Sequence, residues 1–462
     1  MSASVATGIC VCLILWLLAR DRTLHSRCSG NLWIPVLWLC IIGSRPVASW
    51  FGLEPADAHT EGSPFDRLVF LALILAAFVA LQRRKVSWVR VAAANKWLFV
   101  LMIYFGISTL WADDPFISFK RWIKEIGNFA MVLVVLSEEE PATAVKSVLF
   151  RCGIFLIPTS VLLIKYYPDL GRYYNPFIWT YSYGGVTTNK NDLGMGLFAC
   201  TIGLYWGILD LWHQRSEHRK EVFAHLLLIG MCLWLYAKAN CATALACSAL
   251  GAGILSAMKV PAFRNALQRV GLWGLLILAL TTLFLNALFN PMEVVVEGLG
   301  RNMTFTGRTD IWHQVLQVDI NPLIGAGYNS FWQPGRAESV SKALGFFFTL
   351  QEAHNGYLET YLNSGLIGLV LLVIVLQGGA RRIINGLDAG DSYEAFCLAV
   401  LVGAVLYNMT ESAFCGLLIL WVILLLAIMR FPRPSNAARD IVSELGVQGS
   451  KPSVEYYLHE AS

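Results

Sequence analysis

The sequence contains few charged residues. Only 14% of its 462 residues are Asp, Glu, Lys or Arg, whereas 56% are hydrophobic, and soluble domains usually carry roughly 25% charged residues. This composition excludes a soluble globular enzyme, a disordered chain and a collagen-like fibre. The formal net charge of +4 is too small to indicate a nucleic-acid-binding protein. Because the apolar residues form long blocks separated by short charged segments, we predict a polytopic membrane protein with an all-α fold.

The sequence also lacks the patterns that commonly hold metals or cofactors. None of its eleven cysteines forms a Cys-x-x-Cys pair, and no His lies at ligand spacing from them. Most of these cysteines lie inside apolar runs, where Cys commonly packs as a small apolar side chain. Asp113–Asp114 is followed by Pro115, which favours a helix N-cap over a site for a divalent cation. We therefore expect no cofactor, no disulfide framework and no essential metal.

Apolar blocks recur along almost the whole chain, and a membrane-spanning helix needs about 20 residues. We predict a helical bundle of about 12–13 transmembrane helices, several of which are short for a span. The least secure block is the fifth, because Arg121, Lys124 and Glu125 lie in or near its first turns. The blocks cover residues 4–19, 31–51, 67–82, 97–112, 122–137, 146–164, 193–212, 223–238, 241–258, 271–289, 358–376, 393–409 and 414–429.

The distribution of Lys and Arg predicts how these helices are oriented. Every second connection between blocks is rich in Lys and Arg, and such connections usually face the cytoplasm. We therefore divide the chain into four parts. These are N-terminal membrane helices (1–289), one large outer loop containing short helices (290–357), C-terminal membrane helices (358–429) and a cytoplasmic tail (430–462).

Several cations lie on the predicted outer side, against this topological trend. They include Arg121, Lys124, Lys190, Arg301 and Arg308. One interpretation is that an anionic substrate at the outer leaflet binds them. The alternative is that long loops tolerate charge and that Lys and Arg at helix ends extend their charged groups towards water.

Several short motifs flank the predicted helices and occupy the long outer loop. Together they resemble the O-antigen ligase and polymerase superfamily of bacterial membrane proteins, and most closely its exopolysaccharide-production branch. The resemblance covers residues 95–430. The motifs are Gly300–Arg301, Thr306–Thr309, Ile311–Trp312, Pro322–Gly327 and His354–Glu359, with Asn189–Gly194 upstream and Tyr407–Ser412 downstream.

The resemblance implies a metal-independent membrane glycosyltransferase. It would transfer a glycan from an undecaprenyl-pyrophosphate carrier to an acceptor sugar hydroxyl, on the outer (periplasmic) face of the bacterial inner (cytoplasmic) membrane. Its partners would be the lipid-linked oligosaccharide, a glycan or lipid acceptor, membrane lipids and other polysaccharide-assembly membrane proteins, with no nucleic acid. The amino-acid sequence of Thr304–Trp312, which is typical of the exopolysaccharide branch, favours a polymerase over an O-antigen ligase.

Two arginines of the outer loop match the needs of such a donor. The pyrophosphate is an anionic leaving group, and the planar guanidinium group stays charged and binds phosphate oxygens with two donors. Arg308 lies at the start of an expected helix over 308–320, whose N-terminus adds free N–H groups. We predict that Arg301 and Arg308 hold the pyrophosphate. The alternative is that they form salt bridges with Asp310 or Glu352.

A sugar hydroxyl is a poor nucleophile at neutral pH, so a general base with a pKa near 7 would assist it. His354 is our candidate because it lies just before a membrane helix, where the lipid head group must be. His313 is the rival, although a half-buried structural role suits it better. Glu352 or Glu359 could orient the imidazole.

Lys190 and Asn191 open another predicted helix and are candidate phosphate or sugar contacts. The alternative is that Asn191 or Asp192 is the helix N-cap and that Lys190 is a solvated flank.

Arg121 and Lys124 share a helix face and are expected either to hold the carrier phosphate or to anchor the protein at the lipid head groups. The His354–Glu359 motif adds Asn355 and Glu359 to the candidate substrate-binding residues. Glu411 lies near a predicted helix end, and the sequence leaves open whether it caps that helix or contacts the site.

A transporter or flippase of lipid-linked glycan is the alternative function. It would use the outer cations as a gate, but it would not need a His beside a structured outer loop. Transporters built from inverted halves often show an internal repeat and broken, charged helices at mid-membrane. The sequence shows no repeat, and most charges lie near the ends of the apolar blocks.

Overall fold

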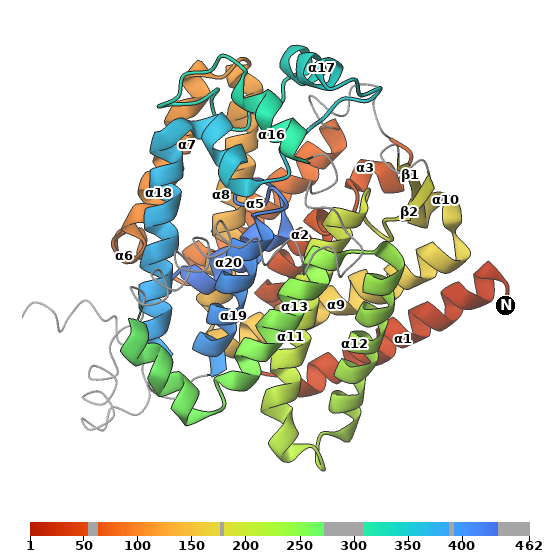
Figure 1. Cartoon of the computed structure of the whole chain (residues 1–462). Helices are drawn as coiled ribbons and strands as arrows, with labels where there is room; N and C mark the ends of the chain where they lie inside the picture. The colour runs from red at the N-terminus through yellow and green to blue at the C-terminus, as the bar shows by residue number, and fades with distance from the viewer. Residues whose placement is uncertain (54–62, 176–179, 272–307, 388–391, 433–462) are drawn as a thin grey trace, which may run out of the picture.

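A computed structural model describes residues 1–53, 63–175, 180–271, 308–387 and 392–432 (Figure 1). These residues form a bundle of helices with a single two-stranded antiparallel hairpin, in which Arg172 pairs with Tyr183. The first elements are α1 (Ala3–Leu24), η1 (Gly30–Leu32), α2 (Trp33–Ile42), α3 (Val47–Trp50), α5 (Pro64–Arg83), α6 (Trp88–Ala94), α7 (Lys96–Ser108), η2 (Thr109–Trp111), α8 (Pro115–Leu136), α9 (Pro141–Tyr166) and α10 (Pro168–Gly171). They are followed by β1 (Arg172–Asn175), β2 (Thr180–Tyr183), α11 (Lys190–Leu211), η3 (Trp212–Gln214), α12 (Arg219–Ala239), α13 (Ala242–Ala257), α16 (Arg308–Leu316), α17 (Pro334–Ala343), α18 (Gly356–Gly386), α19 (Ser392–Tyr407) and α20 (Ile419–Ile428).

The predicted fold class, a polytopic membrane helical bundle, is confirmed. Among the described residues, six helices are long and apolar enough to cross a membrane, or up to eight if each of two bent pairs forms one span. Three shorter apolar helices accompany them. The predicted count of about 12–13 also included the charged α8 and the block at 271–289, and nearly all of that block lies outside the described residues.

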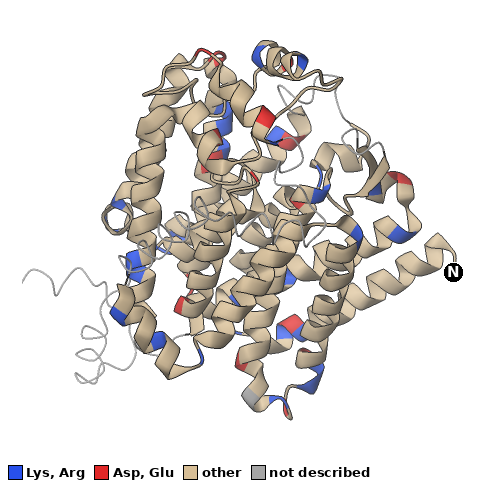
Figure 2. Ribbon diagram, in the orientation of Figure 1, with Lys and Arg blue, Asp and Glu red and all other residues tan. Residues whose placement is uncertain are grey.

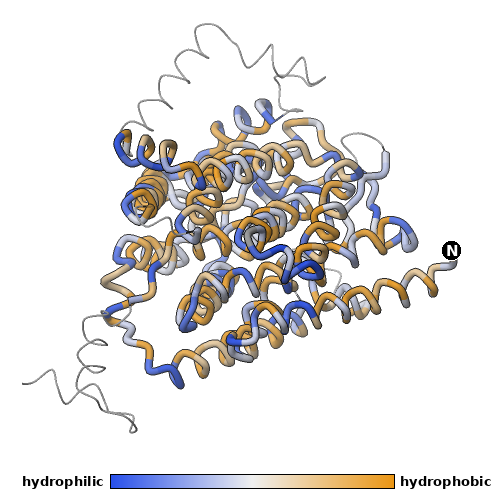
Figure 3. The backbone as a smooth tube through the Cα atoms, turned by 90° about the horizontal axis from the view of Figure 1, so that it is seen from below, coloured by the Kyte–Doolittle hydropathy of each residue, from blue (hydrophilic) through white to orange (hydrophobic). Residues whose placement is uncertain are grey.

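The helices divide into an inner group and an outer group. The most hydrophobic part of α9 is 78% buried, whereas that of α5 is 33% buried and that of α1 only 17% buried. All ten residues of α20 are buried, as expected for a helix that is apolar on every side. Figure 3 shows that α1, beginning at the N-terminus, is hydrophobic along most of its length. The exposed apolar faces of α1 and α5 are therefore suited to lipid.

The described segment that contains α16 and α17 lies at one end of the bundle, which we call the loop end (Figure 1). There, α16 and α17 lie close to the start of α18 (Figure 1). Ile311 and Val315 of α16 are buried against Phe331, Val340 and neighbouring residues in a small core of their own. Figure 2 shows charged residues around this end, and further Lys and Arg residues at the opposite end around the connection from α11 to α12.

The Pro322–Gly327 motif forms backbone hydrogen bonds with α18. At Gly365 the helix is broken by a non-helical backbone with φ of 63° and ψ of −167°, which frees backbone groups on both sides. The amide of Ala326 donates to the carbonyl of Leu362 at 2.9 Å, and that of Leu366 donates to the carbonyl of Pro322 at 2.9 Å. The break in α18 thus serves as the docking site for the motif.

Replacing Gly365 with Ala should destabilise the protein. A Cβ at this position would lie 2.2 Å from the backbone carbonyl group of Leu323, and the positive φ is strained for any side chain, which alone costs about 1–3 kcal/mol. Thermal unfolding in detergent should show a lower midpoint for Gly365→Ala. The matched control is Gly378→Ala in the same helix, where a Cβ meets nothing within 4 Å. That control should keep or raise the midpoint, and equal midpoints for the two variants would contradict the assignment.

Candidate functional site

His354 lies in the turn that leads into α18 at the loop end. Asn355 caps this helix, since its side-chain oxygen accepts hydrogen bonds from the amides of Tyr357 at 3.1 Å and Leu358 at 3.0 Å. The backbone of His354 has a positive φ of 51°, a conformation that is uncommon outside glycine and often marks a functional position. The fold therefore holds the imidazole at a fixed place directly before the helix.

Glu411, which follows α19, brings three other segments together. One of its carboxylate oxygens accepts a hydrogen bond from the Arg308 guanidinium at 2.7 Å. The other oxygen lies 3.2 Å from Nδ1 of His354 and accepts a hydrogen bond from the Asn191 side chain at 2.9 Å. Glu411 is only 4% exposed, so this buried carboxylate links α11, α16 and the start of α18.

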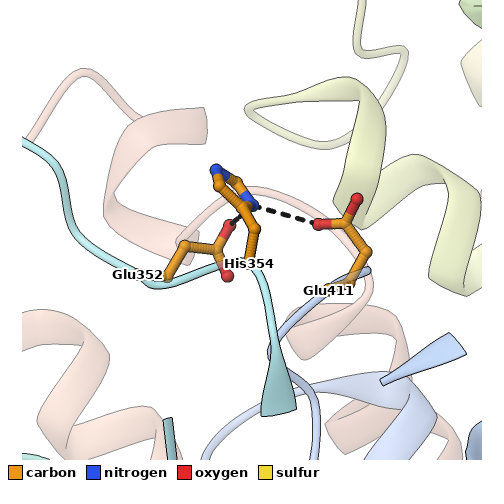
Figure 4. A group of neighbouring side chains, drawn as sticks. All are labelled: Glu352, His354 and Glu411. Carbon is orange, nitrogen blue, oxygen red and sulfur yellow. Dashed lines mark hydrogen bonds and ion pairs between the residues drawn. The ribbon is translucent and has the colours of Figure 1, made fainter. Parts of the chain in front are cut away.

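Glu352 completes the group on the other side of the imidazole. Its Oε1 lies 2.9 Å from Nδ1 of His354. Figure 4 shows both carboxylates on the Nδ1 side of the ring, while the other ring nitrogen points away from them. We call Arg308, Glu352, His354 and Glu411 the histidine cluster; it contains two basic and two acidic side chains.

The two carboxylates strongly change the acid–base behaviour of His354. Burial lowers the pKa of His354, but the charge and hydrogen bond of Glu352 and those of Glu411 outweigh it and raise the pKa to about 10. Burial would raise the pKa of Glu352, but the cations His354 and Arg308 bring it below its usual value. A general base was expected to have a pKa near 7, whereas in this arrangement His354 is protonated at neutral pH.

The cluster also has the donor atoms that a metal ion requires. Ligand atoms of Glu352, His354 and Glu411 lie within 4.8 Å of one another, and this is the one such group among the residues that the structure describes. Carboxylate and imidazole ligands suit several divalent cations. However, the Arg308 guanidinium already neutralises Glu411. The metal-independent reaction stays a prediction.

The structure corrects parts of the expectations for Arg308 and His313. The helix predicted from Arg308 exists as α16, although it ends at Leu316 rather than at residue 320. Arg308 pairs with Glu411, rather than with Asp310 or Glu352 as the alternative proposed. The rival His313 is exposed and lies beside Gln317 on α16, so the half-buried position expected for it is wrong.

Asn189, rather than Asn191 or Asp192, is the N-cap of α11. Its side-chain oxygen accepts hydrogen bonds from the amides of Asn191 and Asp192, both at 2.9 Å. This cap leaves the Asn191 side chain free to reach Glu411. Lys190 contributes backbone contacts, to the Tyr173 hydroxyl and to Cys241, and no contact between its ammonium group and the histidine cluster is present among the described residues.

Three other candidates lie apart from the imidazole. The Arg121 side chain donates to the carbonyl of Asn329, and the Lys124 ammonium lies over the Phe70 ring, 5.4 Å from its centroid. The carboxylate of Glu359 accepts hydrogen bonds from the Trp332 indole at 2.9 Å and from the amide of Ala353 at 3.0 Å. Glu359 therefore fixes the backbone next to His354, and Glu352 is the residue that contacts the ring.

The paired acids before α8 have the structural role that the sequence favoured. The Asp114 carboxylate accepts a hydrogen bond from the amide of Ile117 at 2.9 Å, with Pro115 at the first helical position. Asp113 forms an ion pair with Arg336 at 2.7 Å. Arg301, the second arginine predicted to hold pyrophosphate, lies outside the described residues.

Comparison with known proteins gives two matches. Residues 216–373 match the O-antigen ligase family, a region that includes Arg308, Glu352 and His354. The exopolysaccharide production protein ExoQ of Rhizobium meliloti (strain 1021) is 24% identical over 333 residues, which are 68% of this chain and 71% of that protein. These findings confirm the resemblance to the O-antigen ligase and polymerase superfamily, in its exopolysaccharide branch. They support a polysaccharide ligase or polymerase type of function.

Proposed function

We propose that this chain transfers a glycan from an undecaprenyl-pyrophosphate carrier to an acceptor sugar hydroxyl, at the outer face of the bacterial cytoplasmic membrane. The observation that carries the proposal is the histidine cluster. Arg308, His354 and Glu411 come from three separate segments, yet Glu411 lies 2.7 Å from the Arg308 guanidinium and 3.2 Å from the His354 imidazole. This proximity supports a role for Arg308 as the cation at the leaving phosphate and a role for His354 as the proton acceptor.

Arg308 is suited to the donor pyrophosphate. A guanidinium group has five N–H donors, and the bond to Glu411 uses one of its terminal nitrogens. No second partner of this guanidinium is present among the described residues, so its other donors remain for phosphate oxygens. Charge-assisted bonds of this kind stabilise the negative charge that develops as the pyrophosphate leaves.

His354 is suited to the acceptor. Glu352 and Glu411 hold its Nδ1, so its neutral form keeps the proton there and presents Nε2 as the acceptor. The hydroxyl oxygen attacks the anomeric carbon, its proton passes to Nε2, and the bond from that carbon to the pyrophosphate oxygen breaks with its electron pair going to the pyrophosphate. Attack from the face opposite the leaving group inverts the anomeric configuration.

We favour a polymerase over an O-antigen ligase. The exopolysaccharide-type motif, Thr304–Trp312, supports this choice, and so does the Rhizobium relative, which is an exopolysaccharide production protein. A flippase for lipid-linked glycan is the alternative, but transport gives no reason for an imidazole held between the half-buried carboxylate of Glu352 and the buried carboxylate of Glu411, which also pairs with Arg308.

Reconstitution of the full chain tests the function. Purified protein in liposomes receives an undecaprenyl-pyrophosphate-linked oligosaccharide, with no nucleotide sugar and with or without a chelator. We expect longer glycans by mass spectrometry, equimolar release of undecaprenyl pyrophosphate, and the same yield with the chelator. Movement of intact donor across the bilayer with no new glycosidic bond would overturn the proposal, and loss of product with the chelator would overturn metal independence.

The transfer rate should rise with pH. Since His354 has a raised pKa of about 10, only about one molecule in a thousand holds the neutral, proton-accepting imidazole at pH 7. The single-turnover rate should therefore increase about tenfold per pH unit between pH 7 and 9. The Glu352→Gln variant removes the carboxylate that contributes most to raising the pKa of His354. The transfer rate of this variant should therefore stop rising at a lower pH than that of the wild type.

The exposed carboxylate Glu217 provides the control for this experiment. Glu217 lies in the connection between α11 and α12. The Glu217→Gln variant should have the same pH profile as the wild type. A rate that is flat or falls between pH 7 and 9 would show that His354 does not act as the base.

A further inference from the structure

Glu125 of α8 is a buried acid that takes no part in the reaction steps proposed above. Its side chain is 0% exposed. Its carboxylate accepts hydrogen bonds from the Gly416 amide at 2.9 Å, the Asn128 side chain at 3.1 Å and the Tyr328 hydroxyl at 3.3 Å, and a further one from the Trp421 indole. These donors are all uncharged, so among the described residues hydrogen bonds rather than an ion pair hold the carboxylate.

A carboxylate is a costly way to fill a helical core. Desolvation of the charge is unfavourable, and apolar side chains of similar volume often replace buried charges with no loss of stability. Acidic residues inside membrane proteins are accordingly rare and commonly mark functional positions. A buried polar network that is fully hydrogen-bonded fixes one arrangement of the groups it joins. The donors to Glu125 come from α8, from the segment between α16 and α17, from the connection between α19 and α20, and from α20.

Gly416 lies in the connection between α19 and α20, which also carries Glu411. Both backbone polar groups of Gly416 are held by α8. Its amide donates to Glu125, and its carbonyl accepts a hydrogen bond from the Asn128 side chain at 2.9 Å. The turn at this residue has a positive φ of 83°, a conformation that suits glycine. The helix α8 therefore anchors the connection shortly after Glu411.

The same connection contacts the segment that carries the imidazole. The amide of Asn355 donates to the Ser412 hydroxyl at 3.1 Å. The carboxylate of Glu411 lies 3.2 Å from Nδ1 of His354 (Figure 4). A displacement of the connection would therefore move both the carboxylate beside the imidazole and a support of the backbone next to it.

We infer that Glu125 is a positioning residue for the histidine cluster. It acts through Gly416, whose fixed position keeps Glu411 beside His354. The effect of Glu125 on glycan transfer rests on the proposed function, whereas its effect on the imidazole is measured without any substrate.

The pKa of His354 reports the position of Glu411. The charged groups that face the imidazole are Glu352 on its own segment and Glu411 after α19. Arg308 of α16 is bound to Glu411, and Asp192 of α11 lies within electrostatic reach of both carboxylates. The hydrogen bond and the charge of Glu411 contribute to the raised pKa of about 10. An imidazole whose Glu411 partner has moved away should therefore have a lower pKa.

Titration of His354 by NMR tests the inference. The full chain carries isotope-labelled histidine in detergent micelles, and the His354 resonance is the one that is missing from His354→Asn. In Glu125→Gln the pKa of His354 should be lower by about 1 or more, because the Gln side chain places an N–H group against the donors that the carboxylate accepted. An unchanged pKa, with or without a lower thermal unfolding midpoint, would show that Glu125 only stabilises the fold and would overturn the inference.

Glu125→Asp separates the position of the side chain from its charge. It keeps the negative charge but is one CH₂ group shorter, so it should lose the Gly416 amide, and the pKa of His354 should fall in this variant too. An unchanged pKa in Glu125→Asp would overturn the inference. It would mean that any fall in Glu125→Gln comes from the lost charge acting on the imidazole directly. Glu125→Asp also decides the question where Glu125→Gln does not fold.

Two controls test whether the effect is specific to the link through Gly416. Trp421→Phe removes one donor from Glu125 but leaves Gly416 bound, so it should lower the unfolding midpoint and keep the pKa of His354. Asp21→Asn makes the same carboxylate-to-amide change at a 1% exposed acid in α1 and should also keep the pKa. Equal falls in the two controls and in Glu125→Gln would reflect a general loosening of the bundle and would overturn the inference.

Glycan transfer in liposomes separates this inference from the proposed function. Glu125→Gln should lower kcat on the high-pH plateau at least about tenfold, a larger change than in either KM, because catalytic groups lose much of their effect when displaced by about 1 Å. Wild-type protein that forms no glycosidic bond would defeat the proposed function, while a lower pKa of His354 in Glu125→Gln would still support the positioning role. A wild-type plateau rate in Glu125→Gln would overturn the role of Glu125 in the reaction.

Discussion

Replacing His354 with Ala should lower the rate of glycan transfer by about 10²–10⁴-fold, the range typical for loss of a general base. The variant loses the only ring nitrogen that can accept the hydroxyl proton in our proposal, while Arg308 and Glu411 keep their contact. The rate is measured with saturating donor and acceptor in liposomes. A His354→Ala protein that transfers glycan at a rate near wild type would remove the imidazole from the mechanism.

Two further variants make this result interpretable. Alanine at a φ of 51° is strained, so His354→Asn is the better comparison, since Asn tolerates this conformation and cannot accept the proton. Both variants should insert and unfold cooperatively, yet transfer glycan at a similarly reduced rate. His313→Ala removes an exposed imidazole from α16 and should retain the wild-type rate.

Local sequence patterns were sufficient for much of the fold. The apolar blocks correspond to helices wherever the structure describes them, because burial in lipid or in a helical core requires long apolar runs. The sequence also predicted the helix N-cap at Asp114, which is followed by Pro115. Both signals depend on neighbouring residues alone, although the cap of α11 is Asn189 rather than the expected Asn191 or Asp192.

The organisation of the site depended on contacts that no local pattern encodes. Glu411 is 57 residues from His354 and 103 from Arg308, so its central position follows only from the packing of α16, α18 and α19. The break at Gly365 was likewise missed, since an isolated glycine in an apolar run does not distinguish a continuous helix from a broken one. The signal that could have indicated Glu411 was an acid placed directly after an apolar block, in a segment already matched to the superfamily.

Glu411→Gln should abolish most transfer and also destabilise the protein. The change preserves the shape of the side chain but removes the negative charge that Arg308 and His354 share. Removing one partner of a buried ion pair costs about 3–5 kcal/mol, because the remaining cation stays buried without compensation. We expect a clear drop in the thermal unfolding midpoint in detergent, together with a transfer rate at least about 10²-fold lower.

The double variant Arg308→Gln/Glu411→Gln shows whether the two residues act as a pair. It has lost both charges, so its unfolding midpoint should lie closer to the wild type than the sum of the two single effects predicts, while transfer stays abolished because the pyrophosphate contact is gone. Glu217→Gln, the same change at an exposed carboxylate in the connection between α11 and α12, should alter neither measurement. Additive single effects on the unfolding midpoint would mean that Glu411 does not hold Arg308 in place. The Arg308 guanidinium would then reach the donor by a route that is independent of the histidine cluster.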